Sequence, residues 1–554
     1  RLQLNRDLSI LGDGATTFAP DVRLHGGAVF PYPTWTIGGA QVTVNGTLSA
    51  EGDNAAPVAG NLVWTITSST GQLHLAGDVV PKFSNSGNNK TLCFNGNADI
   101  MISGVIRTSG SGSGKAALAT HGGFSGLLHL SASNTYERGT VHRSGLIELA
   151  NDHALGSGVL TMSGPDSTNF PRLAAAGGSR TIPNDLGFGP SAGIAGNHAL
   201  TFTGSGSLAG SGFDFEGVHG RMLILSNAAP CTFLRPFSMG GDNSGNERRF
   251  NIDTRLNTAV VRFEGGIPQP NPTWYRTLKK HGPGTVILEG TNSYHGETFI
   301  ARGTVRLNGV LASNEFAVVI QSNGSFAGTG TVVRPVQVNS HGIIAPGDDV
   351  GAMTIRSNLR VRVGAIYAWE IGATTNDLLD VSSSEVTFDG SWTLALGDAG
   401  GSPTPNRLYT LLNYGSLSGF DPTHVTIDAS GLPGFSGATV SNDVPNQRLV
   451  LRSGNIDTDG DRMSDDDEII AGTDPMDPDS FLWIRIAQSG SPTNSDLSFQ
   501  SYSNRTYHIQ RSTNLFTGPW LNVRTGLAGD GLLQIIRTSN TVNRLYYRIG
   551  VTMP

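Results

Sequence analysis

A segment near the C-terminal end has the residue types and the spacing of a cation site. Ten acidic side chains and one basic side chain lie between positions 455 and 479. Counted from the first aspartate, oxygen-bearing side chains stand at positions 1, 3, 5, 9 and 12 of a loop: Asp457, Asp459, Asp461, Asp465 and Glu468. At position 7 the main-chain carbonyl of Met463 would add a further oxygen. Calcium takes about six to eight hard oxygen ligands, and a bidentate glutamate closes loops of this spacing. The segment therefore predicts a bound calcium ion.

Two details qualify this prediction. Arg462 stands at position 6, where glycine normally makes the turn. A left-handed backbone at a non-glycine residue costs about 1 kcal/mol, so we expect reduced affinity. Asp474, Asp477 and Asp479 follow the loop and would serve a second ion. The alternative is a solvated acidic linker, although a random run of aspartates would seldom reproduce all five spacings. Because like charges repel without an ion, we expect calcium to turn the linker 454–480 into a stiff joint.

This acidic segment resembles the thrombospondin type 3 and dockerin-type calcium repeats. The residues after the loop, Gly472-Thr-Asp474-Pro-Met-Asp477-Pro-Asp479, match the usual sequel of those repeats.

Few other residues are spaced for chemistry. Asp214 and Glu216 are two residues apart and would share a strand face, and Asp377 with Asp380 is a second acidic pair. Neither pair matches a catalytic signature, and no phosphate-binding glycine loop, Ser-His-Asp signature or zinc spacing is recognised. We therefore expect no enzymatic activity. A secreted polysaccharide lyase or glycosidase, or a glycan-binding protein, remains the alternative, because such proteins also use long β-scaffolds.

The elements that would carry these residues are short strands. A pattern of apolar-x-apolar-x-Gly recurs, as in Val42-Thr-Val44-Asn-Gly46 and Ile100-Met-Ile102-Ser-Gly104. Alternation of this kind is typical of strands, and the glycine marks a bend or a close approach of another backbone. Most gaps between copies lie near multiples of about 20 residues, which indicates a solenoid. We predict a right-handed parallel β-helix over 1–453. Separate β-sandwiches, with hairpins about every 8–12 residues, are the alternative.

Two segments align without gaps at an offset of 158 residues, Asn134–Leu149 and Asn292–Leu307. They resemble the autotransporter-associated β-strand repeat of bacterial surface and secreted passenger domains. Two further segments, Phe326–Val332 and Ala345–Ile355, are similar to sequences near the C-terminal end of such passengers, and 356–453 would be a capping region. The resemblance implies a parallel β-helix outside a bacterium and no particular reaction.

Residues 481–554 alternate as short strands and predict a small β-sandwich. The segment resembles a short C-terminal β-domain that follows calcium repeats in large secreted bacterial proteins, which suggests sorting, anchoring or binding. Its aromatic residues Tyr507, Trp520 and Tyr547 are expected to pack in a core, with stacking on sugars as the alternative.

The composition limits the classes of partner and location that we expect. Glycine is abundant, with 74 residues, charged residues make up 15%, and only five of the 37 basic residues are lysines. No concentrated basic face is recognised, so we expect no nucleic-acid partner. No apolar run reaches about 18 residues, so we expect no transmembrane helix. Cys93 and Cys231 would lie about six turns apart, too far for a disulfide.

We expect an extracellular or cell-surface structural or adhesive protein, secreted with its signal peptide removed. The rod would contact surface glycans or the cell envelope, and copies of it would associate into fibres. Its sheets would need caps or partners at their ends, because open strand edges invite pairing.

Overall fold

The structure is a computed structural model of the whole chain. It describes residues 2–4, 8–12, 14–26, 34–39, 41–52, 61–68, 70–82, 89–108, 114–164, 168–208, 213–215, 218–239, 248–269, 275–401, 407–432, 435, 437–453, 457, 459, 461–489, 493–515, 518–539 and 545–553. The chain divides into two compact units, and each is taken by itself below. The first comprises Arg1–Ala368, Leu378–Trp392 and Tyr414–His424, and the second Trp369–Asp377, Thr393–Asn413 and Val425–Pro554.

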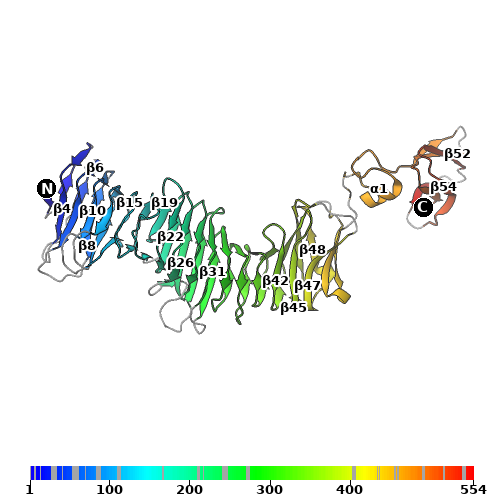
Figure 1. The fold of residues 1–554 in the computed structure, drawn as a ribbon. Coiled ribbons are helices and arrows are strands. Elements are labelled where there is room, and N and C mark those ends of the chain that lie inside the picture. Colours follow the sequence, from blue (N-terminus) through cyan, green and yellow to red (C-terminus); the bar gives the residue numbers. More distant parts are fainter. Residues whose placement is uncertain are drawn as a thin grey trace. The chain divides into compact units, whose positions relative to one another are not determined.

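The first unit is a solenoid whose turns stack as parallel sheets, so the predicted parallel β-helix is confirmed (Figure 1). One face begins with β1 (Leu2–Leu4), β4 (Val22–Gly26), β7 (Leu48–Gly52), β10 (Val79–Lys82) and β13 (Ile106–Thr108). A second face contains β2 (Leu8–Ile10), β5 (Thr34–Ile37), β8 (Asn61–Ser68), β11 (Lys90–Gly96), β14 (Ala116–Thr120), β16 (Thr140–His142), β18 (Leu160–Met162), β21 (Leu186–Phe188), β24 (Gly206–Leu208) and β28 (Phe237–Ser238).

A third face runs the length of the solenoid. Its strands, in ladder order, are β3 (Thr16–Phe18), β6 (Gln41–Val44), β9 (Gln72–Leu75), β12 (Asp99–Ile102), β15 (Leu127–Leu130), β17 (Leu146–Leu149), β19 (Arg172–Ala175), β22 (Ser191–Ala195), β26 (Val218–Leu225), β29 (Arg248–Thr254), β31 (Arg276–His281), β34 (Thr298–Ile300), β37 (Val318–Ile320), β40 (Val336–Val338), β43 (Leu359–Val361) and β45 (Leu378–Phe388). A short antiparallel hairpin joins β25 (Phe213–Phe215) to the start of β26.

A later sheet begins with β20 (Arg180–Ile182), β23 (Leu200–Phe202), β27 (Cys231–Phe233), β30 (Val260–Phe263), β32 (Thr285–Leu288), β35 (Gly303–Leu307), β38 (Gly324–Gly328), β41 (Ile343–Pro346) and β44 (Ile366–Gly372). A side ladder of β33 (Thr291–Asn292), β36 (Val310–Leu311), β39 (Thr331–Val332) and β42 (Ala352–Ile355) also leads to β45.

The number of residues per turn varies more than a fixed period of about 20 residues would allow. Phe326 pairs with Ile344, 18 residues later, whereas Leu48 pairs with Val79, 31 residues later. Parallel pairing fixes only the strands, so extra residues are accommodated in the corners between them. The sequence period of about 20 residues is therefore approximate.

The interior of the solenoid is a narrow stack of apolar side chains. Phe233 stacks between Phe202 and Phe263, with ring centroids 5.1 and 5.0 Å apart. Cys93 and Cys231 are buried free thiols, as predicted.

The recurring glycines allow successive turns to approach closely. A Cβ on Gly77 would clash with the carbonyl of Gly46, and a Cβ on Gly104 would clash with that of Gly77. The glycine of the repeated motif is therefore required by the backbone of the neighbouring turn.

Where the second unit is described, it contains antiparallel strands and one α-helix. β50 (Arg448–Arg452) pairs antiparallel with β47 (Leu408–Ser418) and β49 (Thr439–Asp443). β46 (Trp392–Ala399) and β48 (Val425–Asp428) are further strands of this region. The helix α1 spans Asp465–Ala471, and a 3-10 turn occurs at Val444–Asn446, whereas the 3-10 turn at Pro422–His424 belongs to the first unit. Among the described residues no helix has the length and apolar character needed to cross a membrane.

Two three-stranded antiparallel sheets form the end of the chain, in accordance with the predicted β-sandwich. One has the order β51 (Arg485–Gln488), β52 (Asn494–Gln500), β55 (Leu533–Ser539), and the other β54 (Leu521–Ala528), β53 (Thr506–Ser512), β56 (Tyr546–Thr552). Leu497 and Phe499 of the first sheet share a buried cluster with Tyr507 and Ile509 of the second. Tyr547 packs against this cluster, and the Arg548 guanidinium lies 4.4 Å from the Trp520 ring centroid.

Candidate functional site

Three aspartates of the predicted calcium loop converge. One carboxylate oxygen from each of Asp457, Asp459 and Asp461 lies within 4.8 Å of the other two. Main-chain donors shape the loop around them. The N–H of Arg462 donates to Asp457 Oδ2 at 3.0 Å, and that of Met463 donates to Asp461 Oδ1 at 2.7 Å. These hydrogen bonds hold like charges close together, which is unfavourable unless a cation compensates them.

Helix α1 carries Glu468, the glutamate predicted to close the loop, which is not part of the three-aspartate cluster. Ser464 is its N-cap and accepts a hydrogen bond from the N–H of Asp467, and Gly472 ends the helix with a φ of 88°. The Glu468 side chain is fully buried, and neither of its carboxylate oxygens has a hydrogen-bond partner among the described residues.

The environment of Glu468 suits a cation. Burial, followed by the charge of Asp459, raises the pKa of Glu468 to about 7. Oδ2 of Asp459 and Oδ2 of Asp461 also lie buried without a hydrogen-bond partner in the described part of the chain. Buried polar atoms are nearly always satisfied, so four such oxygens in one loop fit the coordination of an ion. Their hard oxygen chemistry is that of calcium ligands.

Arg462 adopts the left-handed conformation that position 6 of such a loop requires, with a φ of 80°. The sequence predicted the strain at this position. Asp465 begins α1 and is buried, and Met463 lies between the aspartates and the helix.

The three later aspartates occupy a different arrangement. Asp474, Asp477 and Asp479 are exposed, and the first two accept hydrogen bonds from the N–H groups of Met476 and Asp479. Among the described residues these three do not gather into a metal-sized cluster. A second ion at these residues stays a prediction.

The sequence did not predict how the helix is anchored. Arg505 donates through Nε to the carbonyl of Ile470 at 2.6 Å and through a terminal nitrogen to that of Ile469 at 2.7 Å. The Tyr507 hydroxyl donates to the carbonyl of Ala471 at 3.3 Å. These contacts tie the C-terminal end of α1, and so Glu468, to strand β53. The sequence had singled out Tyr507 as a core residue of the C-terminal β-domain without indicating this role.

The candidate acidic pairs have other surroundings. Glu216 and the side chain of Asp214 lie outside the described residues. Asp377 is buried, and its Oδ2 accepts a hydrogen bond from the N–H of Glu370 at 3.0 Å. Asp380 accepts one from the N–H of Ser382 at 3.2 Å. Asp377 and Asp380 therefore stabilise local backbone.

The polar residues shared by the two aligned repeats also serve the fold. The Tyr136 hydroxyl lies 2.6 Å from Thr140 Oγ1, and the Tyr294 hydroxyl lies 2.6 Å from Thr298 Oγ1, in buried pairs. Asn134 and Asn292 each accept a main-chain N–H from the preceding turn, at 2.7 and 3.0 Å.

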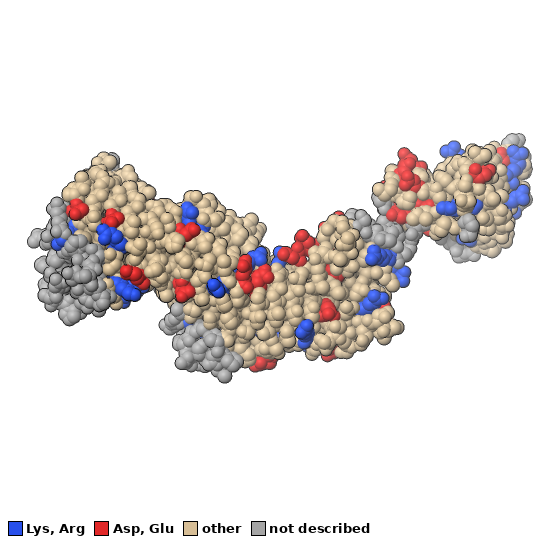
Figure 2. All heavy atoms as spheres, in the orientation of Figure 1, with Lys and Arg blue, Asp and Glu red and all other residues tan. Residues whose placement is uncertain are grey.

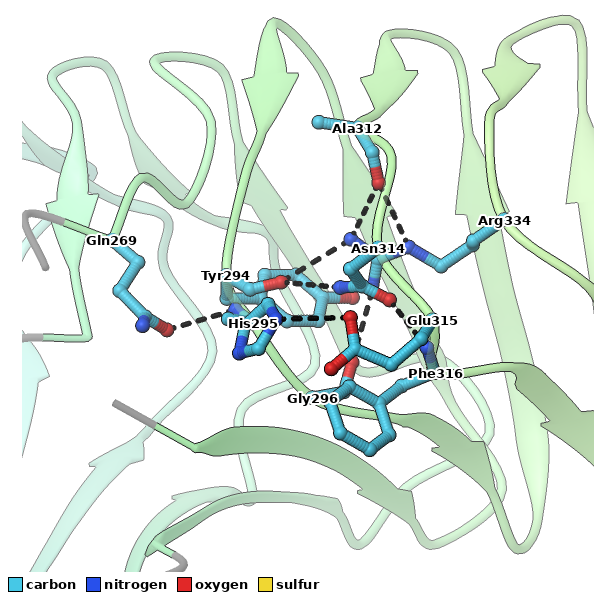
Figure 3. A network of polar contacts seen from close by, with 9 residues as sticks. All are labelled: Gln269, Tyr294, His295, Gly296, Ala312, Asn314, Glu315, Phe316 and Arg334. Carbon is cyan, nitrogen blue, oxygen red and sulfur yellow. Dashed lines mark hydrogen bonds and ion pairs between the residues drawn. The ribbon is translucent and has the colours of Figure 1, made fainter. Parts of the chain in front are cut away.

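Arg334 adds to this arrangement in the second repeat. Figure 3 shows its guanidinium donating to the carbonyls of Tyr294, Gly296 and Ala312, and it also lies 5.1 Å from the Tyr294 ring centroid. On the outside of the same turn, His295 Nε2 lies 3.1 Å from a carboxylate oxygen of Glu315.

Comparison with known proteins supports the resemblance. Residues 278–307 match the Passenger-associated-transport-repeat family, and this range includes the whole second repeat. An extracellular serine protease of Serratia marcescens is 33% identical over 94 residues, which is 17% of this chain and 9% of that protein. The adhesin BmaC autotransporter of Brucella suis is 28% identical over 183 residues, covering 31% of this chain and 5% of that protein. The chain therefore contains autotransporter passenger-type repeats and spans only a small part of the length of these relatives.

Proposed function

We propose that this chain is a non-enzymatic, adhesive part of a protein exposed on the surface of a bacterium. The main observation behind this proposal is that the polar residues of the repeats are buried inside the solenoid. Asn134, Tyr136, Asn292 and Tyr294 are all buried and hydrogen-bonded within the solenoid. A repeat that uses its polar residues in this way builds a scaffold, and a scaffold of stacked turns offers long surfaces for binding. The similarity to an adhesin supports the same role.

Display of the chain on a non-adherent bacterium tests this role. Cells that display it should attach to cultured host cells and to envelope-coated surfaces better than the same cells that do not display it. Attachment equal to that control would refute adhesion. Release of fragments from polysaccharide or protein substrates by the purified chain would instead support the enzymatic alternative.

We also propose that the loop of Asp457, Asp459, Asp461 and Glu468 holds calcium, with Asp465 and the Met463 carbonyl as further ligands. The support is the set of four buried carboxylate oxygens without partners in the described loop. The ion would supply positive charge where three aspartates converge and where the charge of Asp459 acts on the buried Glu468. Because α1 is tied to β53, this charge compensation would stabilise the C-terminal sheets as well as the loop.

Calorimetric titration tests the calcium proposal. The chain should bind calcium, and Glu468→Gln should weaken binding by at least about tenfold, since a bidentate charged ligand is lost. Asp474→Asn is the matched control for the first ion. A stoichiometry that drops from two to one in this variant would establish the second site. Equal affinity of wild type and Glu468→Gln would overturn the assignment.

Association into fibres is a separate proposal. It rests on the sheets of the solenoid, whose edge strands carry main-chain groups able to pair with another copy. Electron microscopy with and without chelator should show fibres in calcium. Discrete rods in both conditions would contradict assembly and leave the adhesive role standing.

A further inference from the structure

Two adjoining depressions form a groove on the N-terminal half of the solenoid. One has a volume of about 560 Å³, and its lining includes Leu11, Ile37, Ser68, Asn97 and Ser125. The second has a volume of about 410 Å³ and shares Ser125 with the first. Volumes of about 300–1,000 Å³ are usual for small-molecule sites.

The groove follows the ladder of the solenoid. Gly38, Ser68, Asn97, Ser125 and Ser144 come from five successive turns, each just before a strand of the third face. At about 4.8 Å per turn, these corners extend on the order of 20 Å. Their shape therefore suits an extended chain with a repeating chemical unit.

The first depression is uncharged and mostly apolar, with Leu11, Ile37 and glycines in its lining beside Thr36, Thr67, Ser68, Asn97 and Ser125. Asn97 is fixed by reciprocal bonds with the main chain of Ser68, both at 2.9 Å. Peptides usually bind β-proteins by pairing with a strand edge. Here the neighbouring strands β8, β11 and β14 are already paired in one sheet. A carbohydrate, whose rings have apolar faces as well as hydroxyl groups, fits such a mixed lining better than a peptide.

The second depression contains an aromatic ring, that of Phe170, and two positively charged arginines. Phe170 lies over β22, where a Cβ on Gly193 would stand only 2.6 Å from its ring, so glycine leaves room for the phenyl group. The Arg255 guanidinium lies 5.7 Å from the Phe170 ring centroid. Its Nε contacts Asp253 at 3.3 Å, which orients the group while its terminal nitrogens can donate to an anion. Arg172 is exposed beside it.

The segment that carries Phe170 is held in place. The Asn169 side chain lies 2.7 Å from Ser144 Oγ and donates to the carbonyl of Gly122 at 3.1 Å. The described lining of this depression contains two arginines and no carboxylate. Hydrolysis of glycosides uses paired carboxylates, so this lining favours binding over cleavage.

We infer that this groove binds an acidic polysaccharide, with Arg172 and Arg255 contacting its carboxylate or sulfate groups and Phe170 facing a sugar ring. The inference adds a ligand class to the proposed adhesive role. Binding of the polymer can be tested without that role, but its biological purpose rests on it. Guanidinium groups pair well with both kinds of anion. The lysine-poor composition and the single ring in the lining argue against a nucleic acid.

Calorimetric titration of the full chain with heparin, polygalacturonate and neutral dextran tests the inference. Binding to heparin alone would identify sulfate as the recognised group, binding to polygalacturonate alone would identify carboxylate, and binding to both would show that either suffices. The double variant Arg172→Gln/Arg255→Gln should weaken that binding by at least about tenfold, and Phe170→Ala should weaken it severalfold. Arg138→Gln, which removes one exposed arginine outside the lining, is the control for loss of positive charge away from the groove and should change the affinity by less than about twofold.

Several results would overturn the inference. They are no binding to either acidic polymer, equal binding to dextran, tighter binding to single-stranded DNA, or equal weakening by the double variant and by Arg138→Gln. Melting temperatures of all variants should match the wild type, which excludes loss of folding as the cause. Displayed chain that adheres to cells but binds neither polymer would refute this ligand class and leave the adhesive role intact.

Discussion

His142 is a titratable side chain enclosed in the solenoid. It is fully buried, its Nδ1 lies 2.8 Å from the Thr120 hydroxyl, and its Nε2 lies 2.9 Å from the carbonyl of Arg172. Burial is the main cause that lowers its pKa from 6.5 to about 4. The folded state therefore favours neutral imidazole, whereas the unfolded chain gains a proton below pH 6.5. Stability from this residue is complete above about pH 6.5 and is lost as the pH falls toward 4.

The aligned second repeat suggests the variant that tests this effect, because Ile300 stands where the first repeat has His142. The solenoid of the wild type should lose up to roughly 3 kcal/mol between pH 7 and pH 4 through His142. His142→Ile should lose correspondingly less over the same range, whatever its stability at pH 7. Thermal melts of both proteins at several pH values measure the difference. Parallel pH curves for the two proteins would show that His142 makes no such contribution.

The strained residue of the calcium loop gives a second prediction. Arg462 has a φ of 80°, where glycine is unstrained. Arg462→Gly should remove about 1 kcal/mol of strain from the loop and tighten calcium binding by about fivefold. Calorimetry measures this change, and Arg462→Lys, which retains both the charge and the Cβ, should bind as the wild type does. If the lysine and glycine variants bind equally tightly, strain at this position does not limit affinity.

At the level of elements, each repeat contains a buried hydrogen bond between a tyrosine and the threonine four residues later. Tyr294→Phe removes the hydroxyl that lies 2.6 Å from Thr298 Oγ1 in the interior. This should lower the free energy of unfolding by about 1–2 kcal/mol, since Thr298 loses its partner. Tyr136→Phe makes the same change in the first repeat and should have a similar effect. Denaturant unfolding of both variants checks the prediction, and unchanged stability in both would show that the pairs are incidental.

The solenoid was predictable from its sequence because strand alternation and glycine spacing report directly on local geometry. Gly77 and Gly104 illustrate this, since each is required by the carbonyl of the preceding turn. The clustering of Asp457, Asp459 and Asp461 could also be predicted, because these residues lie within one short segment, whereas their binding of calcium stays a proposal. Arg505 and Tyr507 could not be assigned to the helix, since hydrogen bonds between residues 35 or 36 positions apart leave no periodic pattern. The groove is similarly formed by corners of many turns, whose length varies.

For the whole molecule, the distribution of charge matters more than its sum. The chain has a net charge of −7, but the segment 455–479 alone carries −9, so the remainder carries +2. Figure 2 shows few and scattered charged side chains on the visible face of the solenoid. Removal of calcium should therefore act locally, on the loop and on the sheets tied to α1, and leave the solenoid unaffected.

Thermal unfolding in calcium and in chelator tests this separation. Chelator should lower the melting transition of the C-terminal sheets by several degrees and leave the solenoid transition unchanged, because the four buried carboxylate oxygens without partners in the described part of the chain belong to the loop and α1. Hydrodynamic radius should increase in chelator as the joint loosens. Glu468→Gln should resemble the chelated wild type even in calcium, while Asp474→Asn should respond to chelator as the wild type does. Identical melting curves and radii in the two conditions would mean that calcium, if bound, does not stabilise the C-terminal sheets or stiffen the joint.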